Sequence, residues 1–232
     1  MNTFATSQEP ALSGTAGNPV APVTAVVFDL DGVLVNSFSV MRQAFTTAYA
    51  EVVGEGEPPF AEYNRHLGRY FPDIMRIMGL PLEMEAPFVR ESYRLAHLVP
   101  AFEGVPELLR DLHSRGIKLA VATGKSGPRA RSLLEQLGLL PLFDIVIGSD
   151  EVARPKPAPD IVLKALDALG APAAQTVMVG DAVTDLTSAR GAGVTAVAAV
   201  WGETDEATLL AENPDVVLRA PAELRRLCED NA

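Results

Sequence analysis

The chain has 232 residues, a net charge of −11 and a hydrophobic fraction of 48%, which suit one large domain or a core with a smaller second domain. The negative charge argues against a general nucleic-acid binder, although a locally positive pocket could still take a small anionic substrate. Cys228 is the single cysteine, which excludes an internal disulfide and a cysteine metal cluster. It also fits a cytoplasmic location, and no run of about eighteen apolar residues predicts a membrane span.

The start of the chain differs in composition from the rest. Residues 1–22 are rich in alanine, proline, glycine, serine and threonine and poor in large apolar side chains, which predicts a disordered leader. This stretch lacks the basic start and the apolar run of a secretory signal. We therefore expect the folded part of the chain to begin at Val23.

Two carboxylates follow the first expected strand. Residues 25–28 form an apolar run that predicts a strand buried on both faces of a parallel sheet. Asp29 and Asp31 come directly after it, at the edge where open α/β sheets bind ligands. In an extended chain such residues point to the same side, about 6–7 Å apart, so a divalent cation between them is expected. The alternative is a strand that ends in a solvated acidic loop.

The next sixty residues show helical spacing and no convincing strand. The pattern predicts an all-helical insert over residues 38–101, above the carboxyl end of the sheet where the first strand releases the chain. Expected helices cover residues 38–53, 58–66, 72–78 and 83–98. In the last of them, we expect the side chains of Phe88, Tyr93, Leu95 and Leu98 to be buried.

From Val105 onward, strand and helix patterns alternate. This alternation predicts a parallel sheet with right-handed crossovers and helices on both faces. We expect Thr184 to cap one of these helices. The expected strands are 118–122, 144–147, 176–179, 195–200 and 215–218, and the expected helices are 106–116, 128–137, 159–169, 184–192 and a last one from Pro221.

Polar residues end three of these later strands. Thr123 and Gly124 offer a hydroxyl and backbone N–H groups that suit a phosphate, although an ordinary capped turn is the alternative. Lys156 lies between two prolines that stiffen its loop, so it could neutralise a phosphate, or belong to a basic surface loop. Asp181 and Asp185 have the spacing of one helix face, so they could serve one metal, one as a direct ligand and one behind it. Alone, Asp185 could be a solvated carboxylate.

Together these residues support one chemistry better than any of them does alone. A carboxylate can attack phosphorus and form an aspartyl-phosphate. The charge of the phosphoester must then be neutralised by a metal and a lysine. A second carboxylate can protonate the leaving oxygen and later deprotonate water.

These residues resemble the four motifs of the haloacid dehalogenase-like superfamily, and the resemblance extends from Val23 to about the C-terminus. It implies an α/β fold with a Rossmann-like parallel-sheet core (23–37 and 102–232) and an inserted all-helical cap (38–101), as in phosphoglycolate phosphatases and β-phosphoglucomutases. The motifs, in order, are Asp29-Leu30-Asp31-Gly32-Val33-Leu34, Thr123-Gly124, Lys156, and Gly180-Asp181 with Asp185. The implied roles are Asp29 as nucleophile, Asp31 as general acid and base, Thr123, Gly124 and Lys156 as phosphate ligands, and Asp29, the Asp31 carbonyl, Asp181 and a supporting Asp185 as the Mg²⁺ site.

Two details narrow this resemblance. The dehalogenase branch does not carry an aspartate at the position of Asp31, so we discount dehalogenation. Asn36 stands where many relatives have aspartate, but it lies outside the catalytic set. The leading function is therefore a Mg²⁺-dependent phosphomonoester hydrolase acting on a small phosphorylated metabolite. A sugar phosphomutase, a phosphoglycolate phosphatase and a non-catalytic protein of the same fold are the alternatives.

The cap sequence resembles the phosphatases of 3-amino-5-hydroxybenzoate synthesis clusters, which implies an amino-sugar phosphate such as kanosamine 6-phosphate. Residues flanking Gly68 are the candidates for contacts with the organic part of the substrate, although solvated loop positions are the alternative, above all for His66. These candidates are Arg65, His66, Arg69 and Tyr70. We expect Trp201 to pack beside the site. Neither a nucleic acid nor a membrane is expected as a partner, and the chain is expected to be a monomer or a homodimer.

Overall fold

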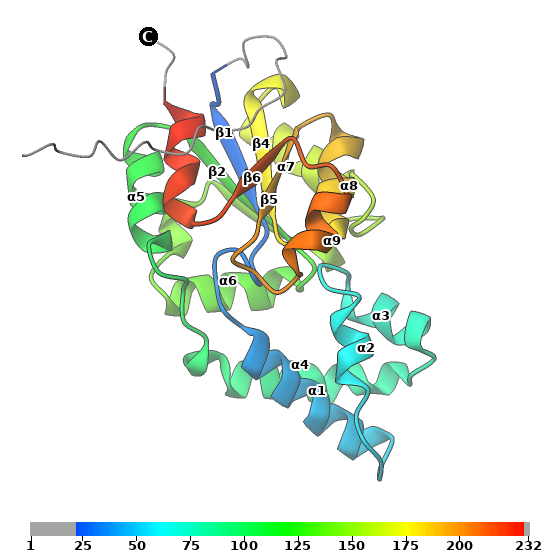
Figure 1. Ribbon diagram of the computed structural model, residues 1–232. Helices are drawn as coiled ribbons and strands as arrows, with labels where there is room; N and C mark the ends of the chain where they lie inside the picture. Colours follow the sequence, from blue (N-terminus) through cyan, green and yellow to red (C-terminus); the bar gives the residue numbers. More distant parts are fainter. Residues whose placement is uncertain (1–21, 230–232) are drawn as a thin grey trace, which may run out of the picture.

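The computed structural model describes residues 22–229, and the expected leader over residues 1–22 lies outside this range apart from its last residue (Figure 1). Six strands in this part of the chain form one sheet in the order β3-β2-β1-β4-β5-β6, and each neighbouring pair is parallel. The strands are β1 (Ala25–Phe28), β2 (Lys118–Thr123), β3 (Ile145–Gly148), β4 (Thr176–Gly180), β5 (Thr195–Ala199) and β6 (Val216–Leu218).

The strand order determines where along the sheet a ligand site is expected. From the central strand β1 the chain builds outward through β2 and β3, then returns to β4 on the other side of β1. The carboxyl ends of β1 and β4 therefore lie side by side at the point where the order reverses, which is where open α/β sheets bind ligands. Phe28 pairs with Val179 at this edge, so the residues that follow each strand emerge next to one another.

Helices cover both faces of the sheet because alternate strand residues point to opposite sides. Val26 and Phe28 pack with helices α5 and α6 and the 3₁₀-helix η6 on one face, whereas Ala25 and Val27 pack with α7, α8 and α9 on the other. The helices are α5 (Val105–Ser114), α6 (Gly127–Gln136), α7 (Asp160–Leu169), α8 (Val183–Ala192) and α9 (Glu206–Ala211), with 3₁₀-helices η3 (Leu140–Leu142), η4 (Ser149–Glu151), η5 (Ala173–Gln175) and η6 (Pro221–Cys228).

A separate helical cap lies at the carboxyl edge of the sheet (Figure 1). Its four α-helices enclose a core of their own, rich in aromatic rings, in which Phe71 stacks on Phe88 with ring centroids 4.1 Å apart. The helices are α1 (Phe38–Val52), α2 (Phe60–Asn64), α3 (Phe71–Met78) and α4 (Glu85–Arg94), with 3₁₀-helices η1 (Leu82–Met84) and η2 (Ala96–Leu98). The predicted α/β core with an inserted all-helical cap is thus confirmed.

The two linkers between core and cap are bonded to each other. Val35, in the linker that leaves the core, forms isolated β-bridges with both Asp31 and Ala101, so the outgoing and returning linkers lie side by side. Asn36 N–H donates to the Pro100 carbonyl at 2.9 Å beside these bridges. The cap therefore joins the core through one short double-stranded joint.

Several local expectations are wrong. Tyr93 and Leu98 were expected to be buried but are 45% and 54% exposed, whereas Phe88 and Leu95 are buried. Tyr93 is five positions after Phe88, which turns it about 140° around α4 and away from the cap core. The helix expected from Pro221 is present as the 3₁₀-helix η6, whereas α9 was not expected.

Thr184 does not cap α8. The helix begins at Val183 with Ala182 as its N-cap, and the Asp185 carboxylate accepts a hydrogen bond from Ala182 N–H at 3.1 Å. The Asp185 side chain, at the third helical residue, thus closes the helix start, and the Thr184 hydroxyl donates instead to the Leu67 carbonyl of the cap at 3.1 Å. Among residues 22–229, none of the helices is both long and apolar enough to cross a membrane.

Candidate active site

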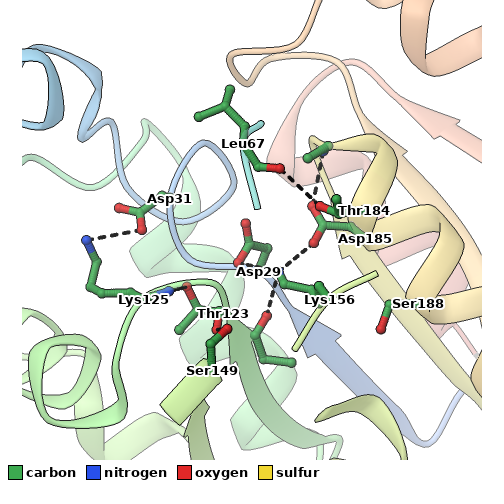
Figure 2. Close-up of polar contacts among 12 residues, drawn as sticks. Asp29, Asp31, Leu67, Thr123, Lys125, Ser149, Lys156, Thr184, Asp185 and Ser188 are labelled. Atoms are coloured by element: carbon green, nitrogen blue, oxygen red, sulfur yellow. Dashed lines mark hydrogen bonds and ion pairs between the residues drawn. The ribbon is translucent and has the colours of Figure 1, made fainter. Parts of the chain in front are cut away.

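Asp29 and Asp31 lie at the same edge of the sheet but face different partners (Figure 2). The Asp29 carboxylate, with only 3% of the residue exposed, accepts from Lys156 Nζ at 3.0 Å. The Asp31 carboxylate accepts from the Ser37 hydroxyl at 2.6 Å and pairs with Lys125 Nζ at 3.1 Å. The two carboxylates therefore do not point to the same side, because the chain turns after Asp29 instead of remaining extended, and a cation held by both stays a prediction.

That turn is visible in the backbone. Leu34 N–H and Val35 N–H both donate to the Leu30 carbonyl, and Gly32 adopts a φ of 83°. A side chain at Gly32 would collide with the Asp181 carboxylate, so glycine is required there for space as well as for its backbone angle. The turn brings the loop after β1 against the loop after β4.

Lys156 is the buried cation of the site. It is 2% exposed, and its ammonium donates to Asp29 at 3.0 Å, to Asp185 at 2.6 Å and to the Ala122 carbonyl at 3.1 Å. Burial disfavours its charge, but the carboxylates of Asp185 and Asp29 hold the pKa of Lys156 above its usual value. All three N–H bonds of the ammonium therefore have an acceptor, and the alternative of a basic surface loop is wrong.

Three buried carboxylates form a group that fits a metal ion. One oxygen from each of Asp29, Asp181 and Asp185 lies within 4.8 Å of the others. Asp181 lies before α8 begins, so it does not share a helix face with Asp185; the turn at Ala182 brings them together. Asp185 uses both oxygens, one with Lys156 and one with Ala182 N–H. Among the described residues, one oxygen each of Asp29 and Asp181 is left without a hydrogen bond.

The electrostatics of this group favour a cation. Burial raises the pKa of Asp29 to about 7, with Lys156 opposing the shift and the carboxylates of Asp185 and Asp31 adding to it. Burial and the neighbouring carboxylates of Asp29 and Asp185 raise the pKa of Asp181 well above its usual value. Lys156 alone therefore does not neutralise the group, and hard oxygen ligands suit a divalent ion such as Mg²⁺.

Asp31 has the opposite shift. Burial alone would raise its pKa, but Lys125 and the Ser37 hydroxyl together hold the pKa of Asp31 below its usual value. Asp31 is thus ionised and held between one residue of the cap linker and one of the loop after β2. In this arrangement its carboxylate can accept a proton, and it can donate one only after a ligand changes the contact with Lys125.

Thr123 and Gly124 end β2 beside these carboxylates, and both line the central cavity. The Thr123 hydroxyl accepts from Lys125 N–H at 3.2 Å. Glycine is required at position 124 for space, because a β-carbon there would lie 2.6 Å from the Gly68 carbonyl oxygen and 2.8 Å from that of Arg69. The cap backbone therefore rests directly on the turn after β2, so the cap is closed against the core in this structure.

The structure places the predicted cap residues in different surroundings. Arg69 lines the central cavity with Leu67 and Gly68, whereas Arg65 and His66 line a neighbouring cavity toward α8. Tyr70 turns toward Glu85, its hydroxyl 3.5 Å from that carboxylate. The loop around Gly68 thus reaches the central cavity, and the local turn determines which of its side chains face inward.

The central cavity, of about 50 Å³, lies between cap and core. Sequence analysis missed three of its charged residues: Lys125, Arg129 on α6 and Glu203 in the loop after β5. The pKa of Glu203 is raised by burial and by the Asp31 carboxylate, which indicates that the two lie close together. Trp201 packs as expected, its indole N–H donating to the Val33 carbonyl at 3.1 Å.

Comparisons with known proteins agree with this geometry. The sequence pattern described as haloacid dehalogenase-like hydrolase matches residues 26–199. A protein of Dickeya dadantii named "Probable phosphatase IndB" is 37% identical over 214 residues, which cover 83% of this chain and 88% of that one. A phosphoglycolate phosphatase of Rhodospirillum rubrum is 36% identical over 208 residues, covering 78% and 81% of the two chains. A pyrophosphatase, PpaX, of Halalkalibacterium halodurans is 33% identical over 215 residues, covering 87% and 95%.

Solved structures show the same architecture. A haloacid dehalogenase-like hydrolase from Streptococcus pneumoniae superposes with a TM-score of 0.76 at 26% identity, over 89% of this chain and 99% of that one. The similarity therefore includes the cap as well as the core.

Proposed function

Because the chain belongs to the haloacid dehalogenase-like hydrolase family and is a phosphatase, we propose that it hydrolyses a small phosphorylated metabolite with Mg²⁺, through an aspartyl-phosphate. The observation that carries this proposal is the buried group of Asp29, Asp181 and Asp185 around Lys156. Such a group is costly to bury without a further cation, and its position at the reversal of strand order suits a ligand site.

The reaction follows from the positions of the two aspartates. Asp31, ionised in the empty site, first takes up a proton from solvent as the substrate displaces Lys125 from its carboxylate. The unbonded oxygen of Asp29 then attacks phosphorus, and the bond from phosphorus to the leaving oxygen breaks as Asp31 gives that oxygen this proton. Asp31 then takes a proton from water, which attacks the phosphorus and breaks its bond to Asp29. Inorganic phosphate leaves, and both carboxylates return to their first state.

Other residues of the site neutralise and orient the phosphate. Lys156 stands against Asp29 and can compensate a phosphate oxygen, and the Thr123 hydroxyl and Gly124 N–H can donate to others. Asp29 and Asp181 would hold Mg²⁺ with the Asp31 carbonyl, and Asp185 would support them from behind. When bound, this ion would neutralise phosphate charge and so favour attack by an anionic carboxylate.

For the substrate we propose an amino-sugar phosphate such as kanosamine 6-phosphate, supported by the resemblance of the cap sequence. Phosphoglycolate is the second candidate, because several similar proteins carry that activity in their names. A phosphomutase needs a site for a second phosphate, and Arg65 and Arg69 are the two cap arginines beside Gly68 that could supply it. Only Arg69 reaches the central cavity, so this alternative loses support.

The test is phosphate release from a panel of sugar phosphates, amino-sugar phosphates and phosphoglycolate, with Mg²⁺ and then with EDTA. We expect Mg²⁺-dependent release that favours one amino-sugar phosphate. Phosphate release that continues in EDTA would contradict the proposed requirement for Mg²⁺. A preference for phosphoglycolate would contradict the proposal that the substrate is an amino-sugar phosphate. Phosphoryl migration on glucose 1-phosphate without net release would replace the hydrolase by a mutase.

The cellular setting is part of the same proposal. The enzyme acts in the cytoplasm as a monomer or homodimer on a free small molecule, without a nucleic-acid or membrane partner. Its single cysteine and its negative charge support this setting.

A further inference from the structure

Arg129 is a buried cation that the phosphatase mechanism does not use. It projects from α6 into the space between core and cap, and the residue is only 9% exposed. Among residues 22–229, no side-chain hydrogen bond or ion pair is formed by its guanidinium. The ring of Phe88 on α4 lies against it, with the centroid 5.1 Å from the guanidinium carbon. The Asp31 carboxylate attracts its charge but is already bonded to Ser37 and Lys125. Buried charges are normally paired, so a bound ligand is expected to complete its contacts.

Its position relates it to the organic part of a substrate. Arg129 lines the central cavity that contains Asp29 and also a second cavity of about 30 Å³ between α1, α4 and α6. The two cavities share Met41, Phe88, Lys125 and Arg129. A molecule whose phosphate lies at Asp29 would therefore extend past Lys125 toward Arg129.

Glu203 faces the same central cavity and is likewise unused. Its backbone N–H donates to Asp181 at 2.8 Å, but within residues 22–229 its carboxylate makes neither a hydrogen bond nor an ion pair. The residue comes from the loop after β5, whereas Arg129 comes from α6, so the two approach the cavity from different elements. The cavity thus offers one unpartnered cation and one unpartnered anion.

The net charge around the central cavity indicates which kind of substrate group would lie between Arg129 and Glu203. With a metal ion bound, so that all the carboxylates are ionised, five carboxylates and four cationic side chains surround the site: Asp29, Asp31, Asp181, Asp185 and Glu203, and Arg69, Lys125, Arg129 and Lys156. A divalent metal ion and a phosphate dianion cancel each other, so one negative charge remains in excess. A second anion on the substrate would double that excess, whereas an ammonium group would remove it.

Resting on the proposed function, we propose that Arg129 and Glu203 select the organic part of the substrate, and that this part is a polyhydroxylated amine. Arg129 donates hydrogen bonds to hydroxyl oxygens, since a guanidinium has five donors and no acceptor. Glu203 accepts hydrogen bonds from the ammonium group. Phe88 holds the guanidinium in place from the cap side, so the selection operates while the cap is closed.

Kanosamine 6-phosphate and glucose 6-phosphate test this assignment, because they differ by one amine in place of a hydroxyl. p-Nitrophenyl phosphate, which lacks both groups, is the reference substrate. Arg129→Met should lower kcat/KM for both sugar phosphates by about 10- to 100-fold and change that for the reference by less than about threefold. Glu203→Gln should remove the preference for the amine. Arg131→Met, on the same helix but paired with Glu151, should alter neither ratio.

A binding measurement separates failure of this inference from failure of the proposed function. In the Asp29→Asn variant, titration calorimetry with the two sugar phosphates should show the same dependence on Arg129 and Glu203. Equal losses on all three substrates in Arg129→Met would assign the residue a structural role and overturn the inference. Tighter binding of phosphoglycolate that depends on Arg129 would overturn it as well, in favour of a second anion. Absence of turnover in the wild type with selective binding retained would overturn only the proposed function.

Discussion

Replacing Lys156 by methionine removes the one cation buried among the carboxylates while keeping the length of the side chain. Asp29 and Asp185, which the ammonium now joins at 3.0 and 2.6 Å, would then face each other with their oxygens within 4.8 Å. At an effective dielectric constant of about 20, two such charges repel by about 3.5 kcal/mol. We therefore expect Lys156→Met to lose about 3–4 kcal/mol of stability at about pH 8 without metal, which agrees with the general cost of breaking a buried pair.

For a chain of this size, that loss corresponds to a fall in Tm of about 6–16 °C, measured by thermal unfolding in EDTA. Part of the loss should return at about pH 6, where Asp29 can take up a proton, and part on adding Mg²⁺. Lys164→Met is the matched control, because Lys164 is an exposed lysine on α7. A fall in Tm no larger than that of the control, or one that does not change with pH, would refute the reasoning.

Three further predictions concern turnover, cap closure and metal binding. Asp29→Asn should keep the fold and its Tm but lose turnover, and activity above a few per cent of wild type would remove Asp29 from the nucleophile role. Gly124→Ala places a β-carbon 2.6 Å from the Gly68 carbonyl oxygen, so overpacking of about 1–3 kcal/mol should destabilise the closed cap. This cost should lower kcat/KM by about 5- to 150-fold. Unchanged kinetics would show that the cap does not close this far in turnover. In the metal-free protein the pKa of Asp29 is raised from 3.8 to about 7, so its contribution to stability is lost as pH rises through that range. Because Mg²⁺ binds the ionised carboxylate, the rise in Tm that it causes should be larger at about pH 8 than at about pH 5.5. An equal rise at both pH values would contradict the assignment of Asp29 as a ligand.

The sequence was sufficient to locate the carboxyl edge of the sheet and the residues that meet there. Asp29, Thr123, Lys156 and Asp181 each follow a strand of the parallel sheet or lie in the loop after one. Because parallel strands end at one edge, reading each strand end was enough to bring these residues together. The helical insert followed equally directly from the absence of a strand pattern.

The directions of the side chains were not predictable in the same way. Asp31 turns toward Lys125 because of hydrogen bonds in the loop after β1, which spacing along the sequence does not reveal. Arg129 lies on a helix whose pattern assigns arginine to the solvent, yet the cap covers it. In both cases the deciding contact comes from a segment distant in the sequence: Lys125 for Asp31 and Phe88 of the cap for Arg129.

The double-stranded joint between core and cap has a mechanical consequence. Val35, which bridges both linkers, is paired with Asp31, and Ser37 at the start of the cap holds the carboxylate of that same residue. A rotation of the cap about this joint would therefore also move Asp31, the proposed proton donor. The position of the Asp31 carboxylate is therefore coupled to the position of the cap.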